Sequence, residues 1–500
     1  MIVGWSLTAL ALVALASAAW IRYRFGKIVF EQFILHIPLG GEAGNNSLFG
    51  EALTWCILLP LGLVGLALLV RQRQGWRLAG RRRVALPTLA LTASLAVLLT
   101  VVGVPKYAAA QLDQRSFADY YVTPAAGRLP ERPKNLITVY LESMENTFGD
   151  AGLFGRNLLS VLDEATDGWG RYETLRQYPE GGWTMAGIVG TQCAIPLKSQ
   201  LLVEGINPNN FGEQMPHYLP GATCLGDVLA EAGYSNTYVG GANTRFAGKD
   251  TFLIDHGYTS IRGREEWEPD EDPAEISVWG ISDHRMFAHA ADTLDELRAS
   301  DQPYHLALLS LDTHEPGGVY PSCATDDAVP MATAITCSTQ ALAGFLAHAE
   351  SIGALEDTVI VVMGDHLKAT AEGGYYKAEL DGTADRSIVL RVWSPDGVAF
   401  TRQNADQFSM LATTLDLLGL EPPDGRAGLG VSFVGDHPVT GTALELEPGE
   451  YETVMTSPSS GLYRTFWEAP EPEATPTVEA TPEPEAESTG STPRAVQPHQ

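Results

Sequence analysis

Three long apolar runs near the start of the chain constrain its fold more than any other feature of the sequence. They cover residues 2–20, 48–70 and 84–104, and each is long enough to cross a hydrocarbon core of about 30 Å. The sequence therefore predicts a bundle of about three transmembrane helices over residues 1–104. A linker over residues 105–134 follows it.

The first apolar run has a second interpretation, as a cleaved signal peptide. Its stretch LASAA offers the small residues at which a signal peptidase cuts. The run lacks the basic start of a signal peptide, however, so we expect it to be a retained anchor.

The arginines predict the orientation of the bundle. The loop between the second and third runs reads RQRQGWRLAGRRR, and such a loop stays in the cytoplasm. The third helix then carries everything after Pro105 to the other side of the membrane. Arg22, Arg24 and Lys27 would lie outside in this orientation, but the denser arginine cluster decides it. Residues 28–39 read as an additional helix that lies at the membrane surface or dips into it.

The charge of the chain excludes one class of partner. The 500 residues carry a formal net charge of −29, which argues against non-specific binding of nucleic acid. Part of this charge lies in residues 468–500, which are rich in Pro, Glu, Thr and Ala and have few large apolar groups. We expect a disordered acidic tail there, and docking of a partner is the alternative role for it.

The cysteines fit an external compartment, where disulfides form. Cys56 lies in the second apolar run and is expected to be a packing residue. The other four cysteines allow three pairings, and the shortest loops are closed by Cys193 with Cys224 and by Cys323 with Cys337. Zinc binding is the alternative, but no CxxC or HxxxH spacing supports it.

Residues 135–437 alternate between apolar strand-like runs and amphipathic helices. This order is typical of an α/β domain with a doubly wound, mostly parallel sheet that is covered on both faces. A C-terminal segment over residues 438–467 follows the domain. The expected strands are 135–142, 236–241, 304–314 and 358–366, and the expected helices are 223–234, 284–300 and 338–357.

Acids and histidines stand where three of these strands end. The first ends in Glu142, the third in Asp312 and His314, and the fourth in Asp365 and His366. Because the carboxyl ends of parallel strands meet at one edge of the sheet, we expect these side chains to share a site there. A helix cap or a surface charge is the ordinary role of one such acid. Carboxylate and imidazole together suit manganese, zinc or iron.

A threonine and two cations are further candidates. Thr184 follows a glycine pair and stands at an expected helix start, so it is either a nucleophile beside a metal or an N-cap. Arg245 and Lys249 follow a short strand, where they either contact an anionic head group or belong to a solvated loop. The absence of a GxxxxGK[ST] motif argues against a P-loop nucleotide enzyme.

Several stretches resemble one known family. The chain is similar to the phosphoglycerol transferase I family, which decorates osmoregulated periplasmic glucans of Gram-negative bacteria. It resembles the lipoteichoic acid synthases more distantly, and both belong to the alkaline phosphatase and sulfatase superfamily. The matching stretches are NLITVYLESMENT, WTMAGIVGTQCAIPL, TCLGDVLAEAGY, GGANTRFAGKDTFLIDHGY, WGISDHRMF, LDTHEPGG and VIVVMGDHLK.

The resemblance implies an alkaline phosphatase-like fold and specific roles for matching residues. It implies a divalent metal, most often Mn2+ with Mg2+ or Zn2+ as alternatives, and we expect a single one because the two-metal ligand set of true phosphatases is not evident. Thr184 matches the nucleophile and also faces the metal, and His314 matches a histidine that handles protons. The remaining implied metal ligands are Glu142, Asp365 and His366. The implied substrate-binding residues are Arg245, Lys249, Asp283 and Trp279.

The resemblance also implies an activity and a location. A phosphoglycerol group would pass from phosphatidylglycerol to a periplasmic glucan through a covalent threonine intermediate. The protein would be a multi-pass bacterial inner-membrane protein with a periplasmic catalytic domain. A phosphoethanolamine transferase, another hydrolase of the superfamily and an inactive membrane-anchored glucan-binding protein are the alternatives. A sulfatase proper needs a C/S-x-P-x-R context, which the sequence lacks.

Overall fold

The computed structural model describes most of the chain. The described residues are 2–35, 50–74, 82–113, 115–127, 130–198, 216–323, 327–371 and 373–468. Residues 469–500 of the predicted acidic tail and residues 75–81 of the arginine-rich loop lie outside these ranges.

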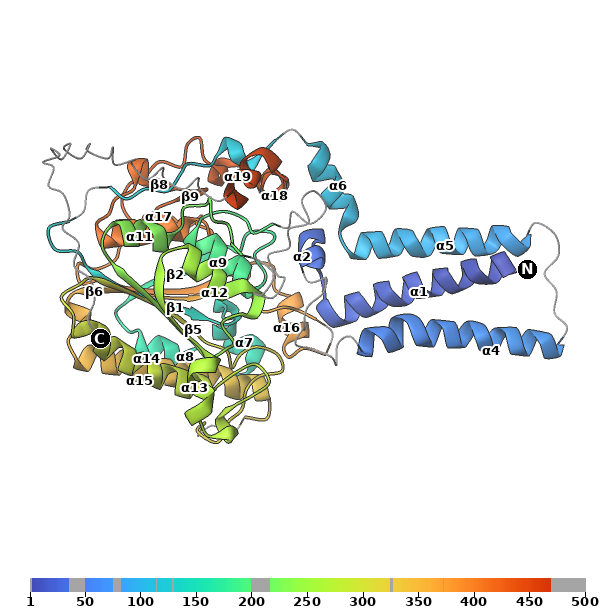
Figure 1. Cartoon of the computed structure of the whole chain (residues 1–500), viewed down its shortest axis with the longest axis horizontal. Helices are drawn as coiled ribbons and strands as arrows, with labels where there is room; N and C mark the ends of the chain where they lie inside the picture. Colours follow the sequence, from blue (N-terminus) through green and yellow to red (C-terminus); the bar gives the residue numbers. More distant parts are fainter. Residues whose placement is uncertain are drawn as a thin grey trace, which may run out of the picture.

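Three apolar helices extend side by side from one end of the molecule (Figure 1). They are α1 (Ile2–Phe25), α4 (Leu59–Gln74) with the π-helical turn η1 (Leu53–Leu58) before it, and α5 (Arg82–Val101). All three are long and apolar enough to cross a membrane, and most of their surface is exposed, as a lipid-facing surface would be. The three predicted spans are therefore confirmed by length and composition.

Two short helices lie where this bundle meets the rest of the molecule (Figure 1). They are α2 (Phe30–Leu35) and α6 (Val104–Leu112), and the rings of Phe30 and Tyr107 lie 4.7 Å apart between them. The predicted helix over residues 28–39 is confirmed for Phe30–Leu35; residues 28 and 29 are not helical, and residues 36–39 lie outside the described ranges. The described part of α2 lies at the end of the bundle, between the apolar helices and the rest of the molecule (Figure 1).

A seven-stranded sheet forms the centre of the α/β domain (Figure 1). The strand order is β2-β7-β6-β1-β5-β3-β4, and β7 alone runs opposite to the other six strands. The predicted mostly parallel sheet is thus confirmed. The strands are β1 (Asn135–Leu141), β2 (Gly170–Leu175), β3 (Ser235–Gly240), β4 (Tyr258–Arg262), β5 (Tyr304–Leu309), β6 (Thr358–Gly364) and β7 (Ile388–Trp393).

Helices cover both faces of the sheet, as a doubly wound fold requires. Alternate residues of β1 show this, because Leu136 and Tyr140 belong to one buried cluster and Ile137 and Val139 to the other. The first cluster contains α9 (Thr184–Gln192), α11 (Leu225–Glu231), α12 (Lys249–Asp255) and α17 (Ser409–Leu418). The second contains α8 (Ser160–Ala165), α14 (Asp283–Arg298) and α15 (Pro330–Ser351).

The last described helices pack into the same domain. Tyr463 in α19 is fully buried, and its hydroxyl accepts a 2.6 Å hydrogen bond from the backbone N–H of Lys198. Tyr451 in α18 donates from its hydroxyl to Asp406 at 2.7 Å. The remaining elements are α7 (Ala151–Phe154), α13 (Arg264–Trp267), α16 (Lys377–Asp381), β8 (Arg426–Ala427), β9 (Gly430–Val431), α18 (Pro448–Met455) and α19 (Ser460–Trp467).

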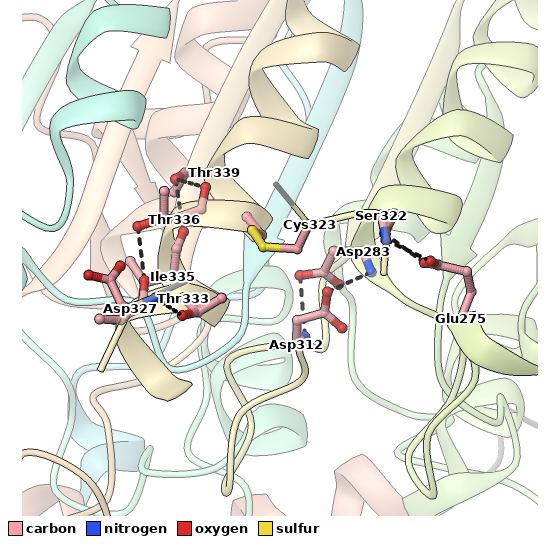
Figure 2. Close-up of a disulfide and its surroundings, with 12 residues drawn as sticks. Glu275, Asp283, Asp312, Ser322, Cys323, Asp327, Thr333, Ile335, Thr336 and Thr339 are labelled. Atoms are coloured by element: carbon pink, nitrogen blue, oxygen red, sulfur yellow. Dashed lines mark hydrogen bonds between the residues drawn. A yellow bond between two sulfur atoms is a disulfide. The ribbon is translucent and has the colours of Figure 1, made fainter. Parts of the chain in front are cut away.

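Two disulfides brace the loops around the sheet. Cys193 pairs with Cys224 and joins the end of α9 to the start of α11. Cys323 pairs with Cys337 and ties the segment that follows β5 to α15 (Figure 2). Both predicted pairs are confirmed, and Cys56 is a free buried thiol.

Candidate active site

The predicted site residues of β1 and β6 meet at one edge of the sheet. These two strands are neighbours, so Glu142 after β1 lies beside Asp365 and His366 after β6. One ligand atom of each residue lies within 4.8 Å of the others, and all three side chains are buried. The other such group in the described part of the chain is built around His256, but both of its sulfurs belong to a disulfide.

Asp365 is fixed by backbone donors on one side of its carboxylate. Its Oδ1 accepts hydrogen bonds from the N–H groups of Ser143 and His366, both at 2.8 Å. Its Oδ2 is buried and has no hydrogen-bond partner among the described residues. A buried carboxylate oxygen without a partner is costly unless a cation or a donor reaches it.

His366 presents one ring nitrogen to the two carboxylates. Its Nδ1 donates to the carbonyl oxygen of Leu367 at 2.9 Å, because a carbonyl can only accept. The other nitrogen, Nε2, lies 3.6 Å from Glu142 Oε1 and 3.6 Å from Asp365 Oδ2. This is the way in which a metal-binding histidine is oriented by a carbonyl on its far side.

The electrostatics of the three residues call for positive charge. Burial, followed by the charge of Glu142, raises the pKa of Asp365 to about 7. Burial opposes protonation of His366, but Asp365 and Glu142 outweigh it and raise the pKa of that imidazole. Two carboxylates, one imidazole and an unpartnered buried oxygen therefore fit a divalent cation by donor chemistry.

Thr184 faces this cluster from the first turn of α9. Its hydroxyl donates to Glu142 Oε2 at 3.2 Å. The N-cap position is occupied by Trp183, and no side-chain cap hydrogen bond forms there, so Thr184 is not the N-cap. The helix amino terminus beside it favours an anion.

His314 and Trp279 form a second side of the site. Their rings lie 4.1 Å apart. His314 Nδ1 donates to the carbonyl oxygen of Glu315 at 3.1 Å, which leaves Nε2 as its other polar atom. Burial tends to raise the pKa of Glu142, but the charges of His366 and His314 outweigh it and the net shift is downward.

The other three predicted substrate residues lie in different surroundings. Lys249 is buried, with its ammonium 5.8 Å from the centre of the Tyr238 ring, and burial lowers its pKa to about 8. Arg245 is exposed. The carboxylate of Asp283 accepts from the N–H groups of Leu311 and Asp312, so the backbone takes up both of its oxygens.

Sequence reasoning missed residues that hold the cluster from behind. Ser143 has a positive φ of 53° and donates from its hydroxyl to Glu142 at 2.6 Å. Gln407 donates to the carbonyl oxygen of Asp365 at 2.8 Å, and Thr313 donates to that of Glu142 at 2.5 Å. Ser143 and Thr313 adjoin predicted residues, but nothing in the sequence singles out Gln407.

The site lies toward the end of α1. A Cβ on Gly26 would lie 2.7 Å from the carbonyl oxygen of Thr370, in the loop after β6. Lys368 in that loop pairs with Glu315, the neighbour of His314. In Figure 1, α16 likewise lies between the sheet and the apolar helices.

The sequence is similar to curated proteins named phosphoglycerol transferase I. The chain is 31% identical over 425 residues to phosphoglycerol transferase I of Escherichia coli O127:H6, covering 81% of this chain and 53% of that one. It is 33% identical over 341 residues to phosphoglycerol transferase I of Salmonella arizonae, covering 66% and 43%. The chain thus spans about half the length of the curated relatives it matches.

Solved structures with a similar backbone fold are less similar in sequence than these curated relatives. A protein of the alkaline phosphatase superfamily from Vibrio parahaemolyticus is 17% identical with a TM-score of 0.49, covering 73% of this chain and 95% of that one. Lipooligosaccharide phosphoethanolamine transferase A from Neisseria meningitidis is 13% identical with a TM-score of 0.48, covering 83% and 84%.

The family model named sulfatase matches residues 134–420, which is more than half of the chain and contains the whole of the site described above. The chain belongs to the sulfatase family.

Proposed function

We propose that this protein transfers a phosphoglycerol group from phosphatidylglycerol to a hydroxyl of a periplasmic glucan, through a covalent intermediate on Thr184. The observation that carries the proposal is the hydrogen bond of 3.2 Å from the Thr184 hydroxyl to Glu142, inside a cluster suited to a metal. The similarity to two curated proteins named phosphoglycerol transferase I supports the choice of the transferred group.

Glu142, Asp365, His366 and the Thr184 hydroxyl would hold one divalent metal, with Mn2+ as the first choice. When bound, such an ion supplies positive charge that lowers the pKa of a nearby hydroxyl and offsets charge on phosphoryl oxygens. The unpartnered Oδ2 of Asp365 supports this assignment.

Thr184 is the nucleophile in the first half-reaction. Its Oγ1 attacks the phosphorus of the lipid head group, while the hydroxyl proton leaves toward the Glu142 carboxylate that already accepts it. The bond from phosphorus to the diacylglycerol oxygen breaks. The amino terminus of α9 favours the negative charge that gathers on the phosphoryl oxygens.

His314 handles the second proton. In the first half-reaction its Nε2 gives a proton to the departing diacylglycerol oxygen. In the second, the same nitrogen takes a proton from the acceptor hydroxyl as that oxygen attacks phosphorus. Thr184 then leaves with its bonding electron pair and regains its proton from Glu142, so Thr184, Glu142 and His314 all return to their starting states.

The cations and the tryptophan would bind the donor. Lys249, when protonated, adds positive charge beside the buried acids, and Arg245 lies at the exposed end of the same segment. Trp279 presents an aromatic ring beside His314, suited to cover the glycerol carbons.

The location follows from the same proposal. The three apolar helices would span the bacterial inner membrane, and residues 135–437 would form the catalytic domain in the periplasm. The contact between Gly26 and the loop after β6 supports this arrangement, because it brings the site to the end of a membrane helix, where lipid head groups lie.

Mass spectrometry of the purified full chain tests the proposal. After incubation with Mn2+ and phosphatidylglycerol, we expect a phosphoglycerol adduct on the peptide that contains Thr184. Thr184→Ala should abolish the adduct and the release of diacylglycerol, whereas Thr184→Ser keeps the hydroxyl and should retain both. Thr191→Ala is the matched control, since Thr191 lies in the same helix but bonds to Tyr140 and the helix backbone.

Other outcomes separate the alternatives. An adduct formed from phosphatidylethanolamine and not from phosphatidylglycerol would identify a phosphoethanolamine transferase. Release of free glycerol phosphate at the same rate with and without glucan would identify a hydrolase. Bound metal with no lipid turnover at all would identify an inactive binding protein.

A further inference from the structure

Two buried acids behind His314 are not used by the proposed reaction. Asp283 is fully buried at the start of α14, and Asp312 is 5% exposed in the segment after β5. Figure 2 shows the two side chains facing one another close to the Cys323–Cys337 disulfide. We refer to this pair as the Asp283–Asp312 clasp.

The clasp is a reciprocal exchange of hydrogen bonds between carboxylates and backbone amides. Asp283 accepts from the N–H of Leu311 at 2.6 Å and from that of Asp312 at 3.2 Å. Asp312 returns the contact, because its Oδ2 accepts from the N–H of Asp283 at 2.9 Å. Three hydrogen bonds thus fix the start of α14 against the residues that lead into His314.

A third carboxylate, that of Glu275, connects the clasp to the segment around Ser322. Glu275 accepts from the hydroxyl of Ser282 at 2.6 Å, one residue before Asp283. It also accepts from the N–H of Ser322 at 3.0 Å and from its hydroxyl at 2.8 Å (Figure 2). The disulfide at Cys323 then anchors this turn to α15.

The opposite side of the same segment is attached to a predicted metal ligand. The Ser310 hydroxyl accepts from the N–H of Glu142 at 3.0 Å, and the Thr313 hydroxyl donates to its carbonyl oxygen. Residues 310–314 are therefore held between Glu142 in front and Asp283 behind. His314 is the last residue of this span.

We propose that the Asp283–Asp312 clasp positions His314, and with it the ring of Trp279, at a fixed place relative to Glu142 and Thr184. Asp283 acts through the backbone of residues 311 and 312 and is a positioning residue, not a contact to substrate. The inference rests on the proposed function for the role of His314, and the geometry of the clasp is independent of it.

The burial of the pair is consistent with this role. Burial, and then the charge of Asp283, raise the pKa of Asp312 well above its usual range. The Tyr320 hydroxyl lies near Asp312 and partly offsets the shift, although Oδ1 has no hydrogen-bond partner among the described residues. Two carboxyl groups in one low-dielectric site disfavour each other's charge, and the three backbone N–H groups that they accept from offset part of the cost of burying them.

Asp283→Asn tests the inference, because it replaces one acceptor by an NH2 group that cannot accept from a backbone amide. In steady-state assays with phosphatidylglycerol we expect kcat to fall by roughly 10- to 100-fold, with KM unchanged within about twofold. Asp227→Asn is the matched control. It alters another carboxylate that accepts a backbone N–H, that of Cys224 at 2.8 Å, and that also pairs with His256 at 2.7 Å. Asp227 lies in α11 and, within the described part of the chain, makes no hydrogen bond with residues 310–314, so this variant should leave kcat unchanged.

A double-mutant cycle with His314→Ala separates positioning from direct contact. If Asp283 acts through His314, Asp283→Asn has little further effect once His314 is alanine. Effects that multiply, or a raised KM with unchanged kcat in Asp283→Asn alone, would overturn the inference.

A readout without turnover keeps the two proposals distinct. In protein labelled at its histidines, the His314 ring resonance is assigned by its disappearance in His314→Gln. We expect Asp283→Asn to move or broaden this resonance and Asp227→Asn to leave it in place. An unmoved resonance in folded Asp283→Asn protein contradicts the clasp. If Asp283→Asn shifts the resonance but the wild-type protein does not cleave phosphatidylglycerol, the clasp is supported and the proposed function is contradicted.

Discussion

Gly187 packs directly against the backbone of Asp365, with no room for a side chain between them. A Cβ on Gly187 would lie 2.0 Å from the carbonyl oxygen of Asp365, and Gln407 donates to that same oxygen at 2.8 Å. This close approach is what brings the first turn of α9, and Thr184 with it, to the end of β6.

The Gly187→Ala variant should therefore move Thr184 away from Glu142, Asp365 and His366. The added methyl group must push α9 away from backbone that cannot yield, so we expect diacylglycerol release to fall by roughly 100-fold or more. Gly344→Ala is the matched control, because Gly344 is also helical and a Cβ there meets nothing within 4 Å. It should stabilise α15 by about 0.5–1 kcal/mol in thermal unfolding and leave turnover unchanged. Normal turnover by Gly187→Ala would show that α9 tolerates the displacement.

Removal of one proposed metal ligand should abolish turnover and weaken metal binding together. In Glu142→Gln one carboxylate charge is lost where two carboxylates and one imidazole converge, so we expect at least a roughly 100-fold weaker affinity for Mn2+. Isothermal titration with Mn2+ measures this directly. Dialysis of the wild-type protein against a chelator should stop turnover, and added Mn2+ should restore it. Unchanged Mn2+ affinity in Glu142→Gln would show that Glu142 does not bind the metal.

Because of Lys249, we expect activity to fall at alkaline pH. Burial lowers its pKa to about 8, with nearby acids, Glu265 first, opposing the shift. If the ammonium binds the anionic donor, kcat/KM should fall as pH rises through about 8. Lys249→Met should lower kcat/KM at neutral pH and flatten this fall. A steep fall that persists in Lys249→Met would assign the titration to another group.

Lys249 should make the free energy of unfolding rise with pH, whereas it makes kcat/KM fall. In the unfolded chain the ammonium titrates near the ordinary value of 10.5, so the unfolded state binds more protons than the folded state between about 8 and 10.5. The contribution of Lys249 to the free energy of unfolding therefore rises with pH across this window. Chemical denaturation of wild-type and Lys249→Met protein at pH 7 and pH 10 measures the difference.

A buried ion pair outside the site provides a test of the fold. Lys198 and Glu180 lie 2.6 Å apart with side chains 1% and 4% exposed. In Glu180→Gln the ammonium stays buried without its counter-charge, so we expect a loss of about 3–5 kcal/mol in the free energy of unfolding. The double variant Lys198→Met with Glu180→Leu should recover most of that loss. Equal stability of Glu180→Gln and the wild-type protein would mean that water reaches the pair.

The parts of the site that could be predicted share a local signal. Glu142, Asp365 and His366 each follow an apolar strand, and parallel strands bring such ends to one edge whatever their separation in sequence. Gly187 and Gln407 carry no such signal, because their roles arise from long-range contacts with the backbone of Asp365. The strands β2, β4 and β7 of the main sheet were also not predicted; β7 lies beside β6 and runs antiparallel to it.

Asp283 illustrates the limit of assigning a role from a motif. Its stretch resembles the family and suggested a substrate contact, whereas its oxygens face backbone amides. A sequence gives the identity of a carboxylate but not the direction in which it points.

Under the proposed function, the contact between the end of α1 and the loop after β6 would confine the encounter with a lipid donor to diffusion in the plane of the membrane. A reaction centre tethered at the height of the lipid head groups meets donor by lateral diffusion and at the high local concentration of the leaflet, not by collision from bulk water. A fragment cut free of its three anchoring helices would keep its chemistry for dispersed short-chain lipid but would encounter vesicles far less often.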